Sequence, residues 1–173
     1  GEYDVADGYF DEYYDRVVKE LQDNGGILEG DRKYTEYSRV IMALSAIGRD
    51  AANVGGYDLT EKLTNYEKVT RQGINGSIFA LIALDTRGYT TSDPDIRQKY
   101  VEDILSQEIE GGGFSLTGET PDPDITAMAI QSLIPYRSDS RVKAAVSRAV
   151  ETLSDLQQAD GGLGSWGSSN SES

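Results

Sequence analysis

The side chains that could carry chemistry in this chain are carboxylates, hydroxyls, tyrosines and one tryptophan, because its 173 residues include no cysteine and no histidine. A cysteine nucleophile, a Ser-His-Asp triad and a metal site built on thiolate or imidazole are therefore excluded. No stretch has the carboxylate spacing of an EF-hand, and no glycine corner ends in the Gly-Lys-Ser/Thr of a phosphate loop. We therefore expect no metal ion and no cofactor.

The densest group of candidate side chains is the segment Asp122-Pro123-Asp124-Ile125-Thr126-Ala127. Asp122 suits the N-cap of a helix, Pro123 the first helical position and Asp124 the first turn. Each of these effects is worth roughly 0.5–1 kcal/mol, which is enough to explain the pattern without chemistry. A helix start is the favoured interpretation, ahead of ligand contact.

Aromatic side chains stand beside the glycine-rich corners that precede the helices expected to be buried. Together with nearby carboxylates, they would suit a sugar, a peptide or a flat hydrophobic cofactor. The alternative is that they close the end of the helix stack, and that Trp166 packs against a further helix. The predicted ligand-binding residues are Tyr34, Glu36, Tyr37, Phe114, Asp122, Asp124 and Trp166.

A repeated phrase, in which a glutamine precedes a glycine-rich corner and the corner precedes an apolar segment, recurs along the chain. The glutamines are Gln22, Gln72, Gln107 and Gln157, so their spacings are 50, 35 and 50 residues. Self-similarity on this scale indicates a stack of supersecondary units, each too small to bury its own apolar face.

Two kinds of helix are expected to alternate around these corners. Residues 10–21 and 140–156 have apolar side chains on one face, which is typical of half-exposed helices. Residues 37–47, 78–84 and 126–134 are apolar nearly all round, which predicts burial on all sides. Asp93-Pro94-Asp95 is expected to cap another helix, and Ser140 to cap the last one. The prediction is an all-α fold of about seven helices in an outer and an inner layer, with few strands or none.

The charge balance of the chain limits its partners. Against 16 basic residues there are 30 acidic ones, giving a formal net charge of −14. This argues against nucleic acids and anionic membranes as partners, because phosphate groups are bound by an excess of Lys and Arg. No apolar run approaches the roughly 18 residues of a membrane span, so no transmembrane segment is expected.

The segment Gln157-Gln158-Ala159-Asp160-Gly161-Gly162-Leu163-Gly164-Ser165-Trp166 resembles the QW-type repeat of the squalene cyclase and protein prenyltransferase superfamily. The resemblance implies an α/α toroid of concentric inner and outer helices over most of residues 10–173. We therefore expect residues 1–173 to be a single toroid fragment, excised from a longer chain and truncated before its next inner helix. The chain also looks like toroid modules of Gram-positive exported and cell-wall proteins. That likeness implies export and neighbouring domains in the same chain.

The same superfamily gives Asp124 a possible catalytic role. The segment from Asp122 resembles the acidic motif of class II terpene cyclases, in which the middle aspartic acid, here Asp124, protonates an alkene. Such an acid needs a pocket that keeps it protonated. Ile125 replaces the third aspartate of the motif and no histidine is available to support the acid. Protein prenyl transfer is also disfavoured, since its zinc ligands include Cys and His.

The sequence therefore predicts a non-catalytic binding or interaction module of an exported bacterial protein. Its ligand, a small molecule, glycan or protein, is expected at the barrel end that carries the glycine corners. The alternative is an isoprenoid cyclase with Asp124 as general acid, and a further alternative is a structural spacer of a cell-surface protein.

Overall fold

The computed structural model describes residues 8–28, 33–157, 161–165 and 168–170, and within them the predicted all-α fold is confirmed. The α-helices are α1 (Tyr9–Asp23), α2 (Thr35–Ala46), α3 (Tyr66–Thr70), α4 (Ile74–Asp85), α5 (Ile96–Ser106), α6 (Pro123–Leu133) and α7 (Ser140–Leu156). Two 3-10 helices, η1 (Thr60–Thr64) and η2 (Ile134–Tyr136), connect them. Two short strands, β1 (Leu163–Ser165) and β2 (Ser168–Asn170), form an antiparallel pair after α7.

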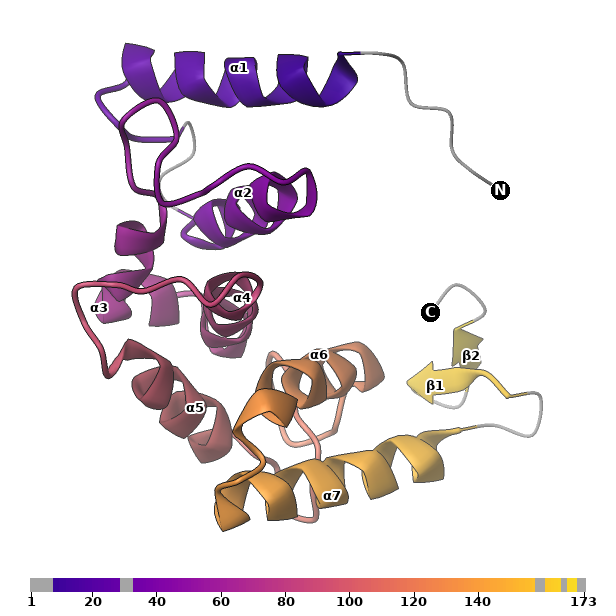
Figure 1. Ribbon diagram of the computed structural model, residues 1–173. Coiled ribbons are helices and arrows are strands. Elements are labelled where there is room, and N and C mark those ends of the chain that lie inside the picture. Colours follow the sequence, from indigo (N-terminus) through magenta and orange to yellow (C-terminus); the bar gives the residue numbers. More distant parts are fainter. Residues whose placement is uncertain (1–7, 29–32, 158–160, 166–167, 171–173) are drawn as a thin grey trace.

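The helices form a curved double layer (Figure 1). Helices α2, α4 and α6 line the inner, concave side of the curve, while α1, α3, α5 and α7 lie outside them. Helix α4 packs against both α2 and α6, α5 packs on α4, and α7 packs on α6. Each half-exposed helix therefore covers an inner one, as the alternation in the sequence predicts.

The three inner helices run in the same direction. At their carboxyl ends, Arg87 Nη1 after α4 donates to the carbonyl oxygen of Arg49 after α2, at 3.1 Å. The Tyr136 hydroxyl after α6 lies 3.0 and 2.8 Å from the two carboxylate oxygens of Asp85 in α4. Because these ends meet, the first turns of all three helices gather at the opposite end of the double layer.

The core lies between the two layers and is built from the apolar faces of the helices. Leu21 of α1, Ile41 and Leu44 of α2 and Leu81 of α4 are all fully buried. The expectation that the inner helices are buried on all sides is wrong for one stripe of α2 and one of α6, whereas the corresponding residues of α4, such as Phe79, are partly buried. Arg39, Ala127 and other residues on the stripes of α2 and α6 remain exposed, because the concave side is open.

Two helices begin at different residues from those the sequence pattern predicts. The N-cap of α5 is Asp95, and Asp93 accepts the Asp95 N–H at 3.0 Å. The N-cap of α7 is Asp139 instead of Ser140, and its carboxylate accepts the Arg141 N–H at 2.8 Å. Aspartate caps a helix as well as serine does, so Asp139, whose carboxylate meets a free N–H group, determines the start of α7. Asp95 forms no side-chain cap bond at the start of α5.

Candidate functional site

The glycine-rich corners before the inner helices are tied to neighbouring elements by side-chain hydrogen bonds. Gln72, before α4, accepts the Thr35 N–H at the start of α2, at 2.9 Å. Before α6, the Thr126 hydroxyl accepts the Phe114 N–H at 3.0 Å and donates to the Phe114 carbonyl at 3.1 Å. These bonds satisfy backbone groups that would otherwise be unpaired. The corners therefore hold the first turns of the inner helices in place.

Three of the four repeated glutamines form side-chain hydrogen bonds within the described part of the protein, and these bonds are structural. Besides Gln72, Gln107 donates to the Asp103 carboxylate at 3.0 Å, and Gln157 donates to the Gly161 carbonyl at 3.2 Å. The repeated glutamines therefore stabilise the corners. The candidate ligand-binding groups are other residues that lie beside these corners.

A close approach between two helices sets the position of α4. Gly76, in the first turn of α4, lies against α3, and a Cβ placed there would be 1.9 Å from the Val69 carbonyl oxygen. Only glycine permits this distance, because any other residue would bring a carbon atom into the backbone of α3. The start of α4 is thereby fixed relative to the outer layer.

The predicted aromatic site residues are part of the core. Tyr34 is 6% exposed, while Tyr37 and Phe114 are fully buried. The rings of Tyr34 and Tyr37 lie 5.2 Å apart, and the ammonium groups of Lys68 and Lys62 cover them at 5.3 and 5.8 Å. The structure therefore brings Tyr34 and Tyr37 together at the start of α2. Phe114 lies beside the first turn of α6, where the Thr126 hydroxyl bonds to its backbone, and α4 packs between α2 and α6. Trp166 lies outside the described residues.

The predicted acidic site residues are more accessible. Asp122 is half-buried, and its carboxylate accepts the Ile125 N–H at 2.9 Å as the N-cap of α6. Asp124 is exposed in the first turn of α6, and Glu36 is partly exposed in the first turn of α2. Asp122 thus has the geometry of a helix cap. Asp124 lies in solvent and not in the enclosed apolar surroundings that a strong general acid requires.

One polar residue that the sequence reasoning missed completes this set. Asn75 is the second residue of α4, as Glu36 is the second residue of α2 and Asp124 the second residue of α6. The Asn75 Oδ1 atom is buried and has no hydrogen-bond partner among the described residues. We call Glu36, Asn75 and Asp124 the rim. The signal was present in the sequence, because Asn75 falls in the repeated corner Gln72-Gly73-Ile74-Asn75-Gly76.

An apolar band lies one helical turn beyond the rim. Val40, Phe79 and Met128 are each four residues after a rim residue, and therefore lie on the same face of their helices. All three are only partly buried. The Arg39 guanidinium lies over the Phe79 ring at 5.6 Å, and Arg39 also forms an ion pair with Glu36 at 2.9 Å. These contacts join the α2 and α4 parts of the band.

The rim and the band together offer a defined chemistry. The carboxylates of Glu36 and Asp124 are accessible hydrogen-bond acceptors, so the rim suits a ligand that carries hydroxyl or ammonium donors, and the unpaired Asn75 Oδ1 lies buried between them. The band offers an apolar and partly aromatic surface next to those acceptors. This combination can bind and orient a ligand, and it contains no pair of groups positioned for nucleophilic or acid–base catalysis.

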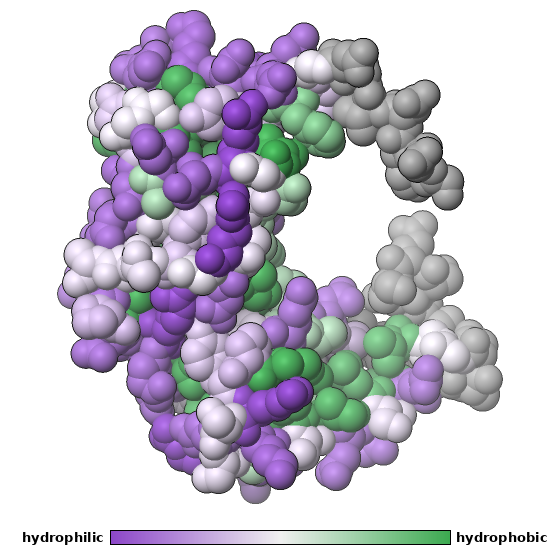
Figure 2. Space-filling view, in the orientation of Figure 1, coloured by the Kyte–Doolittle hydropathy of each residue, from purple (hydrophilic) through white to green (hydrophobic). Residues whose placement is uncertain are grey.

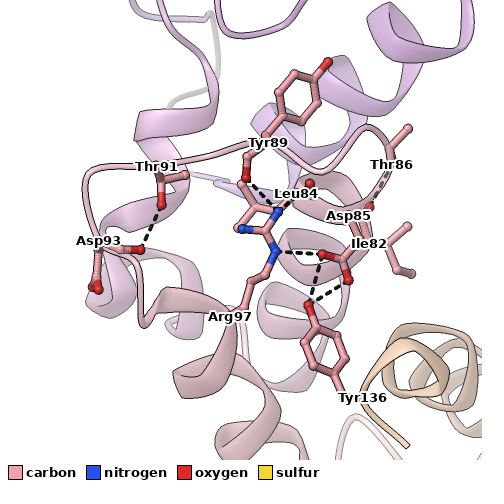
Figure 3. A network of polar contacts seen from close by, with 9 residues as sticks. All are labelled: Ile82, Leu84, Asp85, Thr86, Tyr89, Thr91, Asp93, Arg97 and Tyr136. Carbon is pink, nitrogen blue, oxygen red and sulfur yellow. Dashed lines mark hydrogen bonds and ion pairs between the residues drawn. The ribbon is translucent and has the colours of Figure 1, made fainter. Parts of the chain in front are cut away.

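A second polar network lies at the opposite, carboxyl end of the inner helices (Figure 3). Asp85 accepts bonds from Arg97 Nε at 2.7 Å and from the Tyr136 hydroxyl. Arg97 Nη2 also donates to the carbonyl oxygens of Leu84 and Tyr89, both at 2.7 Å. Burial and, secondarily, the hydrogen bond to Asp85 raise the pKa of Tyr136 above its ordinary value. Because Asp85 binds both Arg97 and Tyr136, this network fastens α4 to α5 and η2.

A third network, between the layers, is also internally paired. The half-buried Asp103 carboxylate accepts bonds from the hydroxyls of Ser77, at 2.5 Å, and Tyr66, at 3.4 Å. Burial and the neighbouring Asp103 charge raise the pKa of Tyr66. Asp103 therefore connects α3, α4 and α5 and is not a free acid or base.

Several other kinds of site are absent from the part of the chain that the structure describes. No cluster of three or more carboxylates is placed to hold a metal ion. None of the described helices combines the length and the apolarity needed to cross a bilayer. Comparison with protein-family models, with curated proteins and with solved structures gave no match.

Proposed function

We propose that this chain is a non-catalytic binding module with the architecture of an arc of an α/α toroid. Three features support this architecture: outer helices alternate with inner ones, the inner helices share one direction, and glycine-rich corners recur at their amino ends. The resemblance of residues 157–166 to the QW-type repeat points to the same arrangement.

We infer that the ligand occupies the concave face at the amino ends of the inner helices. The observation that carries this inference is the repetition of an acceptor and an apolar side chain at equivalent positions of α2, α4 and α6. Adjacent packed helices lie about 8–10 Å apart, so the rim extends about 16–20 Å along the arc. A ligand of that length with donors and an apolar face, such as an oligosaccharide or a basic peptide, fits both parts of the site.

The proposal places the module outside the cell, on or near the wall of a Gram-positive bacterium. The support is the likeness to exported toroid modules, together with a cysteine-free, acidic composition that is compatible with export. The net charge of −14 disfavours nucleic acid as the ligand. In this setting the module would present its concave face to a component of the wall or to a neighbouring domain.

Thermal unfolding in the presence of a panel of oligosaccharides, short basic peptides and planar aromatic compounds tests the proposal. A ligand at 100 times its Kd adds about 2.7 kcal/mol, which corresponds to about 5–10 °C in Tm for a chain of this size. We expect Phe79→Ala in the band to abolish the shift. The matched control is Phe10→Ala on α1, which is 47% exposed and should leave the shift unchanged. If no compound raises Tm, or if both variants respond alike, the chain is a spacer and the proposal is wrong.

A further inference from the structure

A group of basic side chains lies on the outer side of the start of α2, apart from the rim and the band. It consists of Lys33, Lys62, Lys68 and Arg71, which we call the basic patch. Lys68 and Lys62 lie over the adjoining rings of Tyr34 and Tyr37, and Lys33 precedes Tyr34 in the chain. Arg71 is next to Gln72, whose side chain binds the Thr35 N–H. These contacts place Lys62 and Lys68 at the start of α2, and the course of the chain brings Lys33 and Arg71 next to it.

The cations of the basic patch have no ionic partners in the described part of the chain. Most exposed cations elsewhere are paired, for example Lys19 with Asp23, at 2.5 Å, and Arg141 with Glu102, at 2.7 Å. Lys33, Lys68 and Arg71 are exposed, and Lys62 is partly exposed. The patch therefore presents four cations that have no ion pair among the described residues, on a chain whose net charge is −14.

Two further features make the patch suitable for an anion. The N-cap of α2 is Tyr34, which forms no side-chain cap bond, and the acidic residue of the first turn, Glu36, is ion-paired with Arg39. The two lysines are held over tyrosine rings, which limits the entropy they lose when they meet a carboxylate. A bound carboxylate would gain from the lysines and from the helix end together.

We propose that the basic patch binds a short acidic peptide segment of a partner protein. Charge complementarity favours a carboxylate-rich ligand, and the charge of the rest of the molecule limits its length. Screening acts over about 10 Å at 0.1 M salt, so a long polyanion would extend beyond the patch and be repelled by the surrounding acidic surface. This surface is separate from the concave face. The basic patch favours a negatively charged ligand, whereas the carboxylates of the rim favour a ligand with hydrogen-bond donors or positive charge.

Fluorescence polarisation with labelled hexaglutamate as the probe tests this proposal. Binding is expected at about 50 mM NaCl and should weaken strongly at about 300 mM. The double variant K62E/K68E should bind at least about tenfold more weakly, since exposed ion pairs contribute up to about a factor of five each and charge reversal adds repulsion. The matched control K19E/K143E reverses two lysines on α1 and α7 and should bind within about twofold of the parent chain.

Circular dichroism of both variants shows whether they are folded. If a folded K62E/K68E variant binds as tightly as the control, or if hexaglutamate does not bind the parent chain at low salt, the proposal is overturned. Inorganic polyphosphate is the comparison ligand, and tighter binding of this long polyanion than of hexaglutamate would also contradict the assignment. The concave-face ligand plays no part in the assay, so the two proposals succeed or fail independently.

Discussion

Replacing Gly76 by alanine tests whether the close approach of α3 and α4 positions the rim. A glycine in a helix interior is usually less stable than alanine by about 1 kcal/mol, so the exchange should stabilise an ordinary helix. Here the new Cβ would lie 1.9 Å from the Val69 carbonyl oxygen and 2.9 Å from its carbonyl carbon. The sign of the effect should therefore be reversed.

The size of the effect follows from the displacement that the new methyl group requires. Ordinary contact begins at 3.4 Å, so the methyl group and the Val69 carbonyl must separate by about 1.5 Å. The obstacle is backbone, and α3 has to move with the buried Val69. Overpacking costs about 1–3 kcal/mol, and a backbone shift puts this case at or above the upper end of that range. After the gain in helix propensity we expect a net loss of about 2–3 kcal/mol, or about 4–12 °C in Tm.

Urea denaturation followed by circular dichroism measures this change. The control is Ala144→Gly at an exposed position of α7, which should cost about 1 kcal/mol through helix propensity alone. The midpoint should fall in both variants, with an unchanged dependence on urea and a larger fall in Gly76→Ala. A Gly76→Ala variant as stable as the parent chain, or more stable, would refute the argument that α3 and α4 are in contact through backbone atoms.

Three further predictions concern the corners and the polar networks. Asp122→Ala should lower the free energy of unfolding, measured by urea denaturation, by about 1 kcal/mol, and Asp122→Asn should lower it much less, because asparagine also caps helices. Equal losses in the two variants would contradict the role of Asp122 as a helix cap. Thr126→Val should cost about 1–3 kcal/mol and speed hydrogen exchange at the Phe114 amide, because the buried Phe114 N–H loses its partner, while the Phe114 carbonyl keeps its bond from the Asp122 N–H. Unchanged exchange would contradict the bond. The pKa of Tyr136 is raised in the folded state, so folding favours the protonated hydroxyl. The stability that Tyr136 contributes is therefore present below its unfolded pKa of 10.0 and is lost as the pH rises above that value. Measured Tm values should therefore fall more steeply above about pH 10 in the parent chain than in Tyr136→Phe, and parallel curves would refute this.

The helices and their two layers could be predicted because apolar periodicity is a local property of the sequence. The amphipathic pattern of residues 10–21 and the continuous apolar pattern of residues 78–84 each led to the correct kind of helix in the correct layer. The starts of α5 and α7 were harder to predict, because several neighbouring polar residues can each cap a helix.

The candidate site could be predicted only in part, because side-chain direction depends on packing between helices. Tyr37 and Phe114 were expected either to contact a ligand or to close the end of the helix stack, and the structure places them in the core. Glu36 and Asp124 were expected at the same end, and they do lie in the first turns of inner helices. Asn75 was not predicted, because its relevance depends on the position of α4 between α2 and α6. The sequence does not show that order of the helices in space.

The surface in Figure 2 makes clear why the concave side matters to this account. The outline is curved like a letter C, and the open side is the one lined by the inner helices. Residues on this side are less buried than the sequence pattern predicts, and they include the two carboxylates of the rim and the partly buried apolar side chains of the band. Each of α2, α4 and α6 contributes one part of this site, so the site can be recognised only once the packing of the three helices is known.

The most direct test of the binding proposal is a two-dimensional amide NMR titration of the chain with the compound that raises Tm most. The account predicts saturable shifts at the amides of Glu36, Asn75 and Asp124 and at Phe79. It also predicts that amides on the outer faces of α5 and α7 stay unchanged. Shifts confined to the outer layer, or the absence of shifts in the first turns of α2, α4 and α6, would contradict it.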